Sequence, residues 1–179
     1  MSRKKARRRK KAARRALSAA LALVLAAGLG LCLRQWGFGL TWVAGTSMSD
    51  TLRDGDVALV TRFDYLGGRT PDFGDVVACR FPGRADTYLK RVAGLPGETV
   101  TIAGGTLYRD GARVSEPYVS SFPEDYAVVL GAGEYLLLGD NRADSYDSRM
   151  PDMGPVGAQA FLGRARLILW PLSRFGVIK

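Results

Sequence analysis

An uncharged stretch of eighteen residues, ALSAALALVLAAGLGLCL at positions 16–33, constrains this chain more than any other feature. As a helix it would be about 27 Å long, close to the ~30 Å hydrocarbon core of a bilayer. Residues 1–15 before it carry ten basic side chains and no acidic one. A basic flank ahead of an apolar span predicts an inside N-terminus and an outside C-terminal body. We therefore expect a basic cytoplasmic tail over 1–15 and a transmembrane anchor over 16–33.

A cleaved signal peptide is the alternative, because it shares the order of basic residues followed by an apolar run. The run here is longer than the usual signal-peptide core of about 7–15 residues. No pattern of small residues suited to cleavage follows its end. These two features favour the uncleaved anchor. The tail could also bind RNA or be merely solvated, but attraction to anionic cytoplasmic lipid explains it without any further feature.

The net charge of +9 belongs to the tail and not to the body that follows. Residues 16–179 hold 16 basic and 17 acidic side chains, a net charge of −1. A folded nucleic-acid-binding domain normally carries a basic patch of its own. We therefore expect no nucleic-acid partner.

The body reads as short β-strands separated by turn residues, with no sustained helical period. Asp110-Gly111 is a strong two-residue hairpin signal. We expect a membrane-proximal segment over 34–44 and a mostly β, predominantly antiparallel domain over 45–179, in which 104–133 forms a small hairpin cap subdomain. The runs that predict strands are 56–62, 75–81, 87–93, 107–114, 134–140 and 161–170.

The chain contains no histidine, which excludes every Ser-His-Asp and Cys-His device and every His-ligated metal. Its two cysteines, Cys32 in the apolar span and Cys79 in a strand-like run, form no disulfide framework. We expect neither a cofactor nor a metal. A hydrolase built from this chain must deprotonate its nucleophile in another way.

Lys90 is the only lysine between the basic tail and the last residue, whereas every other basic residue there is arginine. On a strand, Tyr88, Lys90 and Val92 would share one face. Arginine stays protonated, but a desolvated lysine can lose its proton. Lowering its pKa from ~10.4 to ~7 takes roughly 4.6 kcal/mol, which full burial can supply. Lys90 is thus the candidate general base; the alternative is a lysine reaching solvent at a sheet edge.

Ser47 is the candidate nucleophile, in the small and polar stretch GTSMSDTL that follows the apolar span. Gly45 lets the backbone pass closely, and the backbone N–H of Ser47 could point at an oxyanion. The alternative is an ordinary turn or cap serine.

A third segment, GDNRADSYDSR at 139–149, follows the apolar run EYLLL and is dense in charged, amide and hydroxyl side chains. Asp147 and Arg149 are spaced so that they could pair across one side of a loop. One alternative is an exposed polar turn with weak surface ion pairs. The other is an acidic metal loop, but the spacing does not match a calcium-binding loop.

Together these segments resemble bacterial type I signal peptidases, which are membrane-anchored Ser/Lys endopeptidases that remove signal peptides from exported preproteins. The resemblance covers nearly the whole chain. It runs from the apolar anchor through the segments GTSMSDTLRDGDVALV, YLKRVAGLPGETV and GDNRADSYDSR to FLGRARLILWPLSRFG near the end.

The resemblance implies a role for each matching residue. Ser47 would be the nucleophile and Lys90 the general base. Ser145 would hydrogen-bond the lysine amine and orient it, and Met48 would help line the site. Gly45 stands where some members carry a side-chain oxyanion donor, so the oxyanion would depend on backbone N–H groups or water.

The resemblance also implies that Asp140, Asp147 and Arg149 shape the polar loop beside the site. The expected partners are preprotein signal peptides, with small residues at −1 and −3, and a phospholipid membrane. The substrate would bind as an extended strand. We expect a monomeric single-pass protein of the cell membrane, with its catalytic domain on the extracytoplasmic face.

Asp50 departs from the family, which usually has proline at this position. One consequence would be a looser turn after the nucleophile. The other would be a carboxylate near Lys90, which would stabilise the protonated amine and oppose the pKa shift that catalysis needs. This leaves open a catalytically impaired, membrane-tethered paralogue or a specialised peptidase of the same fold. A self-cleaving DNA-binding repressor uses similar chemistry, but the apolar span and the absence of a helix-turn-helix pattern argue against it.

Overall fold

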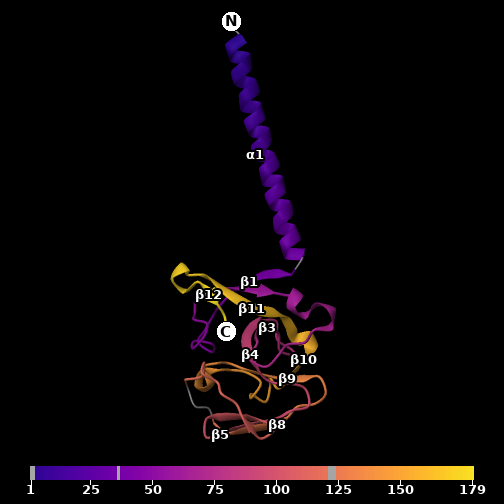
Figure 1. Ribbon diagram of the computed structural model, residues 1–179, viewed down its shortest axis with the longest axis vertical. Helices are drawn as coiled ribbons and strands as arrows, with labels where there is room; N and C mark the ends of the chain where they lie inside the picture. The colour runs from indigo at the N-terminus through magenta and orange to yellow at the C-terminus, as the bar shows by residue number, and fades with distance from the viewer. Residues whose placement is uncertain (1–2, 36, 121–123) are drawn as a thin grey trace. The chain divides into compact units, whose positions relative to one another are not determined.

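The structure, a computed structural model, describes residues 3–35, 37–120 and 124–179 (Figure 1). Parts of three expected segments therefore lie outside the described residues: residues 1–2 of the tail, 36 of the membrane-proximal segment and 121–123 of the cap. The chain divides into two units, Met1–Gly37 and Phe38–Lys179.

The first unit is dominated by one helix, α1 (Arg3–Gln35). Alanine and leucine, which favour helices, make up most of its apolar part. The stretch Arg14–Leu31 is long and apolar enough to cross a membrane, a test that a signal sequence would also pass. Its leucines, Leu17 and Leu29 among them, are more than half exposed. Such a helix needs an apolar surrounding to cover these side chains.

The second unit contains a larger antiparallel sheet in the strand order β1-β2-β11-β3-β4-β9-β10, and β12 pairs with β11 (Figure 1). This agrees with the expectation of a mostly antiparallel β body. The expected strand runs are found close to their predicted positions. The strands are β1 (Phe38–Trp42), β2 (Val57–Thr61), β3 (Val76–Cys79), β4 (Tyr88–Gly94), β9 (Glu134–Leu138), β10 (Val156–Gly157), β11 (Phe161–Trp170) and β12 (Gly176–Val177).

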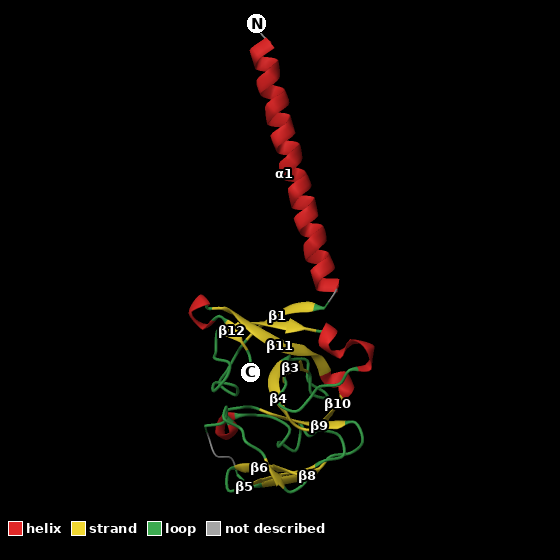
Figure 2. Ribbon diagram, in the orientation of Figure 1, coloured by secondary structure: helices red, strands yellow, loops and turns green. Residues whose placement is uncertain are grey.

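A smaller sheet has the order β7-β6-β5-β8 and comprises β5 (Thr99–Ala103), β6 (Thr106–Arg109), β7 (Ala112–Arg113) and β8 (Tyr126–Val129) (Figure 2). The predicted hairpin turn is present, with φ of 48° at Asp110 and 79° at Gly111. The sheet begins before the expected cap boundary at 104, because β5 pairs with β6 across a tight Gly104-Gly105 turn.

The central strand β4 separates two parts of the core. Leu89 packs in a cluster with Met48 and Val60, whereas Val92 packs with Val77 and Tyr135 in another. Short 3-10 helices fill the connections: η1 (Phe63–Gly68), η2 (Arg142–Asp144), η3 (Ala158–Ala160) and η4 (Leu172–Arg174).

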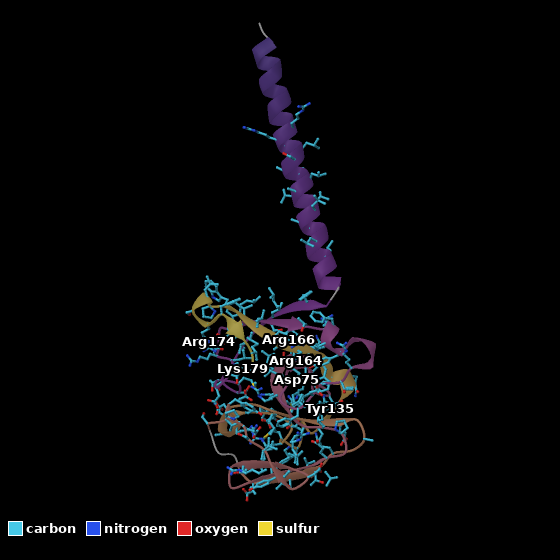
Figure 3. All side chains as sticks on the ribbon, in the orientation of Figure 1. Asp75, Tyr135, Arg164, Arg166, Arg174 and Lys179 are labelled. Carbon is cyan, nitrogen blue, oxygen red and sulfur yellow. The ribbon has the colours of Figure 1, made fainter. Side chains whose placement is uncertain are left out.

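Ion pairs join segments that are far apart in the sequence. Arg164 Nη1 of β11 lies 2.7 Å from Asp75 Oδ1, just before β3, and Figure 3 labels both residues. Arg174 of η4 binds both carboxylate oxygens of Asp56, ahead of β2. These contacts fix the ends of strands on which the candidate site is built.

Candidate active site

Ser47 lies in a compact turn between β1 and β2. Backbone bonds from Ser49 N to Thr46 O (2.9 Å) and from Leu52 N to Met48 O (2.6 Å) close the turn. Met48 is buried and anchors the turn in the core. Gly45 has a φ of +88°, which favours glycine, and its N–H donates to Asp54 Oδ1 at 2.8 Å. The half-buried Ser47 is thereby held at the rim of the core.

Lys90 lies in the middle of β4 and is only 2% exposed. It pairs with Val77 of β3, and the side chains of Tyr88 and Val92 share its face, as the strand pattern predicts. Its Nζ donates a hydrogen bond to Ser145 Oγ at 3.1 Å. The amine is therefore inside the protein, and the alternative of a lysine that reaches solvent at a sheet edge is wrong.

Burial lowers the pKa of Lys90 below its ordinary value of 10.5, because it penalises the charged form. The negative charge of Asp147 acts in the opposite direction and is the largest opposing influence. Asp147 is itself neutralised by Arg149, as the following contacts show.

Ser145 connects Lys90 to a buried ion pair. Its hydroxyl hydrogen-bonds Asp147, and Asp147 Oδ1 accepts a bond from Arg149 Nε at 2.9 Å. Asp147 Oδ2 also accepts from Gly139 N at 3.0 Å. Burial alone would raise the pKa of Asp147, but these bonds and the charge of Arg149 lower it below 3.8. The expected pair is therefore a buried part of the site and not an exposed surface contact.

The loop that carries Ser145 also holds the turn that carries Ser47. Asn141 N donates to Ser47 O at 3.1 Å, and Asn141 Nδ2 donates to Thr46 O at 3.2 Å. Gly139 fills the space between the two serines: a Cβ at this position would lie 2.2 Å from Ser145 Oγ and 2.4 Å from Ser47 O. Close approach of the two segments therefore requires glycine here.

Ser47 and Lys90 line the same pocket, whose volume is about 150 Å³. Its walls come from two stretches of backbone, one around the end of β1 and one around the start of β4. Gly45 and Met48, both expected near the site, are also part of the wall. The remaining lining residues are Thr41, Trp42, Val43, Ala44, Thr87, Tyr88 and Leu89.

Asp140 forms a second buried ion pair with Arg91, the residue after Lys90. The guanidinium of Arg91 binds both oxygens of Asp140, at 2.8 and 2.7 Å, and the two side chains are 1% and 0% exposed. Arg91 also donates to Thr51 Oγ1 at 3.1 Å, and Thr51 in turn donates to Asp140. This network ties the strand of Lys90 to the turn of Ser47.

Asp50 is bound away from the amine. Its carboxylate accepts a hydrogen bond from Ser120 Oγ at 2.7 Å and another from Ser120 N at 3.2 Å. The largest negative influence on the pKa of Lys90 comes from Asp147 and not from Asp50.

This geometry places a serine hydroxyl and a buried amine of lowered pKa around one small pocket. An amine of lowered pKa is the kind of group that can accept the proton of a nearby hydroxyl and activate it as a nucleophile. Among the described residues, no three His, Cys, Asp or Glu side chains are grouped so that they could hold a metal ion.

The sequence reasoning missed several residues that support the site, namely Thr51, Arg91, Ser120 and Gly139. One signal for Arg91 was available: a charged residue inside an apolar strand needs a buried partner. A glycine at the junction of an apolar strand and a polar loop was a weaker signal for Gly139. The partners themselves come from segments too distant in sequence to be paired by pattern.

A family model described as "Signal peptidase, peptidase S26" matches residues 16–170. Signal peptidase I T of Bacillus subtilis is 33% identical over 165 residues, covering 85% of this chain and 84% of that protein. Signal peptidase I of Leptolyngbya laminosa is 34% identical over 167 residues, covering 87% and 78%. A crystal structure of a signal peptidase I from Enterococcus faecalis is 32% identical, with a TM-score of 0.49, and covers 54% of this chain and 97% of its own.

The fold and the pocket define a β-rich protein with a serine and a buried lysine at one site. The match to the family model over most of the chain shows that it belongs to the signal peptidase family, peptidase S26. The resemblance inferred from the three segments is thereby confirmed, and the family is one of hydrolases.

Proposed function

We propose that this protein is a membrane-bound serine endopeptidase that removes N-terminal signal peptides from exported preproteins. Ser47 is the nucleophile and Lys90 the general base. One observation carries the proposal: the Lys90 amine is buried, is hydrogen-bonded to a hydroxyl and lines the same pocket as Ser47.

The hydrogen bonds around Ser145 leave the amine free to act as a base. The Ser145 hydroxyl donates its hydrogen bond to Asp147, so its Oγ can only accept a hydrogen bond from Lys90 Nζ. The lone pair of the Lys90 nitrogen is therefore not used by Ser145. That lone pair can take the proton of Ser47 Oγ while Oγ attacks the peptide carbonyl. Ser145 is thus a positioning residue for the amine.

The reaction then proceeds through an acyl-enzyme. When the peptide C–N bond breaks, the protonated Lys90 gives its proton to the leaving amine. Water next attacks the Ser47 ester with Lys90 again as base, which releases the second product and restores the serine hydroxyl. Gly45 has no side chain to stabilise the oxyanion, so the backbone N–H of Ser47 supplies this stabilisation, with water completing it.

The substrate binds as an extended strand between two open backbone edges. β1 is the end strand of the larger sheet. On the other side, β4 pairs with β9 only from Arg91 onward, so the edge at 88–90 is left open toward the pocket. Strand addition to such edges is a recurrent mode of peptide binding. A pocket of about 150 Å³ favours small residues at −1 and −3.

The body presents an apolar face suited to a membrane surface. Pairing between neighbouring strands aligns two rows of apolar side chains on one face of the larger sheet. The first and last side chains of each row are more than half exposed. Large exposed apolar patches mark interaction sites, and tryptophan favours the membrane interface. The rows are Leu40, Leu59, Leu167 and Val177, and Trp42, Val57 and Trp170.

The anchor adds a second membrane contact. We propose a single-pass topology with residues 1–15 inside and the catalytic body on the extracytoplasmic face, because a basic flank stays inside. Tethering confines enzyme and preprotein to one surface, which raises their effective concentration. The protein acts as a monomer and has no nucleic-acid partner.

The test is cleavage of a preprotein by the full chain in detergent micelles. We expect Ser47→Ala and Lys90→Arg to abolish cleavage, since arginine cannot act as a neutral base. Ser173→Ala in η4 and Lys10→Arg in the tail are matched controls that should retain full activity. Activity of Lys90→Arg would refute the neutral-amine mechanism. If the wild type neither cleaves nor becomes acylated at Ser47, the impaired paralogue is the correct reading.

A further inference from the structure

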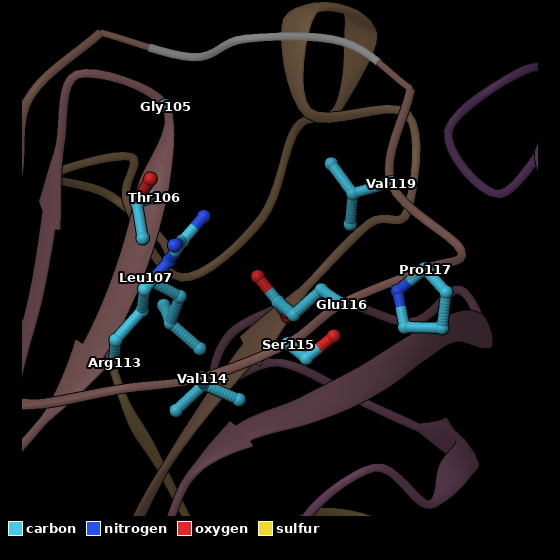
Figure 4. Close-up of a pocket in the computed structure, with 9 residues that line it drawn as sticks. All are labelled: Gly105, Thr106, Leu107, Arg113, Val114, Ser115, Glu116, Pro117 and Val119. Atoms are coloured by element: carbon cyan, nitrogen blue, oxygen red, sulfur yellow. The ribbon is translucent and has the colours of Figure 1, made fainter.

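Residues 116–120, here called the strap segment, run from the cap sheet past the candidate active site. The segment follows β7, whose extension is held by a bond from Val114 N to Leu107 O at 2.9 Å. On one side it borders a pocket of about 500 Å³ in the cap, shown in Figure 4 with Glu116 and Val119. Its polar side chains contact the three segments that carry the catalytic residues.

Two of these contacts are made with buried arginines. The carboxylate of Glu116 binds both terminal nitrogens of Arg142, at 2.6 and 3.0 Å, and Arg142 Nε donates to Gly139 O at 2.9 Å. The ring of Tyr118 lies under the Arg91 guanidinium at 3.8 Å. The strap segment therefore reaches the loop of Ser145 through Arg142, and the strand of Lys90 through Arg91.

The third contact is exposed and reaches the turn of Ser47. Asp50, three residues after Ser47, accepts bonds from Ser120 Oγ at 2.7 Å and from Ser120 N at 3.2 Å. Both residues are exposed, and hydrogen bonds that compete with water contribute little to the free energy of unfolding. A contact of this kind can still restrict where the turn lies, because it joins the turn to a segment that is fixed by the two contacts with buried arginines.

We propose that Asp50 is a positioning residue, which holds the Ser47 turn against Lys90 through the Asp50–Ser120 contact. This inference rests on the proposed function of Ser47 and Lys90. The strap segment contacts each of the three segments that carry the catalytic residues, and its contact with the serine turn is made through the two hydrogen bonds that Asp50 accepts from Ser120. A nucleophile displaced by a fraction of an ångström reacts more slowly even when the substrate binds normally.

The experiment measures kcat, KM and the melting temperature of the full chain in micelles for Asp50→Ala, Ser120→Ala and the double variant. Asp50→Ala loses both bonds, and we expect kcat to fall about tenfold with KM and the melting temperature unchanged. Ser120→Ala keeps its N–H and should show a smaller fall. The double variant should match Asp50→Ala, because both changes act on one contact.

Asp50→Asn keeps a carbonyl oxygen and should recover part of kcat, whereas the matched control Asp72→Ala, at an exposed aspartate outside the site, should equal the wild type. The proposal is overturned if Asp50→Ala keeps kcat within twofold of the wild type. It is also overturned if the losses of the single variants multiply in the double variant, or if kcat falls only together with the melting temperature. Cleavage by the wild type and its loss in Ser47→Ala separate these outcomes from a failure of the proposed function.

Discussion

Replacing Gly139 by alanine tests whether the close approach of Ser47 and Ser145 is what makes the site work. The added Cβ would lie 2.2 Å from Ser145 Oγ and 2.4 Å from Ser47 O, whereas real Cβ atoms essentially never come closer than 3.0 Å to such atoms. The Ser145 hydroxyl must therefore move by about 0.8 Å and the Ser47 carbonyl by about 0.6 Å, from those distances to 3.0 Å. The first displacement disturbs the hydroxyl that binds the Lys90 amine, and the second disturbs the backbone of the nucleophile itself.

A misplacement of about 1 Å can lower a rate by roughly a hundredfold. We expect Gly139→Ala to lower kcat for preprotein cleavage by about this factor, and to slow acylation of Ser47 by a serine-directed inhibitor equally. Both should be measured in micelles beside the melting temperature.

Two other glycines provide matched controls. Gly176→Ala meets nothing closer than 3.8 Å and should behave as the wild type. Gly94→Ala clashes with Val100 at 2.6 Å and Leu130 at 2.8 Å, in the core and outside the pocket. It should lower stability by about 1–3 kcal/mol without changing kcat of the folded fraction. Two results would refute the role of this close approach in catalysis. One is a kcat of Gly139→Ala within threefold of the wild type. The other is a loss of kcat in Gly139→Ala no larger than that in Gly94→Ala.

Two further predictions concern pH. The kcat/KM for cleavage should rise with pH as Lys90 loses its proton. Because burial lowers the pKa of Lys90, the midpoint of this rise should lie below 10.5. A midpoint at or above 10.5 would contradict a buried amine that acts as the base. Asp147 should stabilise the fold at neutral pH, because Arg149 and Gly139 outweigh the effect of burial and lower its pKa below 3.8. This stability is present above 3.8 and lost as pH falls through the lower folded value, so the melting-temperature difference between the wild type and Asp147→Asn should shrink there. A difference that stays constant into strong acid would show that the charge of Asp147 does not stabilise the fold.

The local features of this chain could be predicted from its sequence because their causes are local. Alternation around Lys90 predicted its strand and its face, and the Asp110-Gly111 pair predicted the hairpin turn, in which both residues have positive φ. The spacing of Asp147 and Arg149 predicted their pairing. Only the burial of that pair was unexpected, since a short polar loop gives no sign that a sheet and a cap will cover it.

The supporting contacts could not be predicted, because each joins segments whose proximity depends on the whole fold. Arg91 binds Asp140, which is 49 residues away, and Ser120 binds Asp50 at a separation of 70. Pattern reasoning gives each segment a conformation but no partner. Asp50 shows the consequence: the sequence alone left open whether it would loosen the turn after Ser47 or place a charge near Lys90, whereas in the fold its carboxylate is bound to the strap segment.

The contrast between Lys90 and Arg91 explains why one strand carries two adjacent basic residues of different type. Both side chains are almost completely buried, which by itself disfavours either charge. Arg91 cannot lose its proton and is matched by two carboxylate oxygens of Asp140. Lys90 faces the hydroxyl of Ser145, and Asp147, the carboxylate that most opposes the lowering of its pKa, is already paired with Arg149. At equal burial, Arg91 is a charged structural link because a carboxylate pairs with it. The neutral amine is favoured at Lys90 because its partner is a hydroxyl. The difference between the two residues therefore comes from their partners and not from how deeply they are buried.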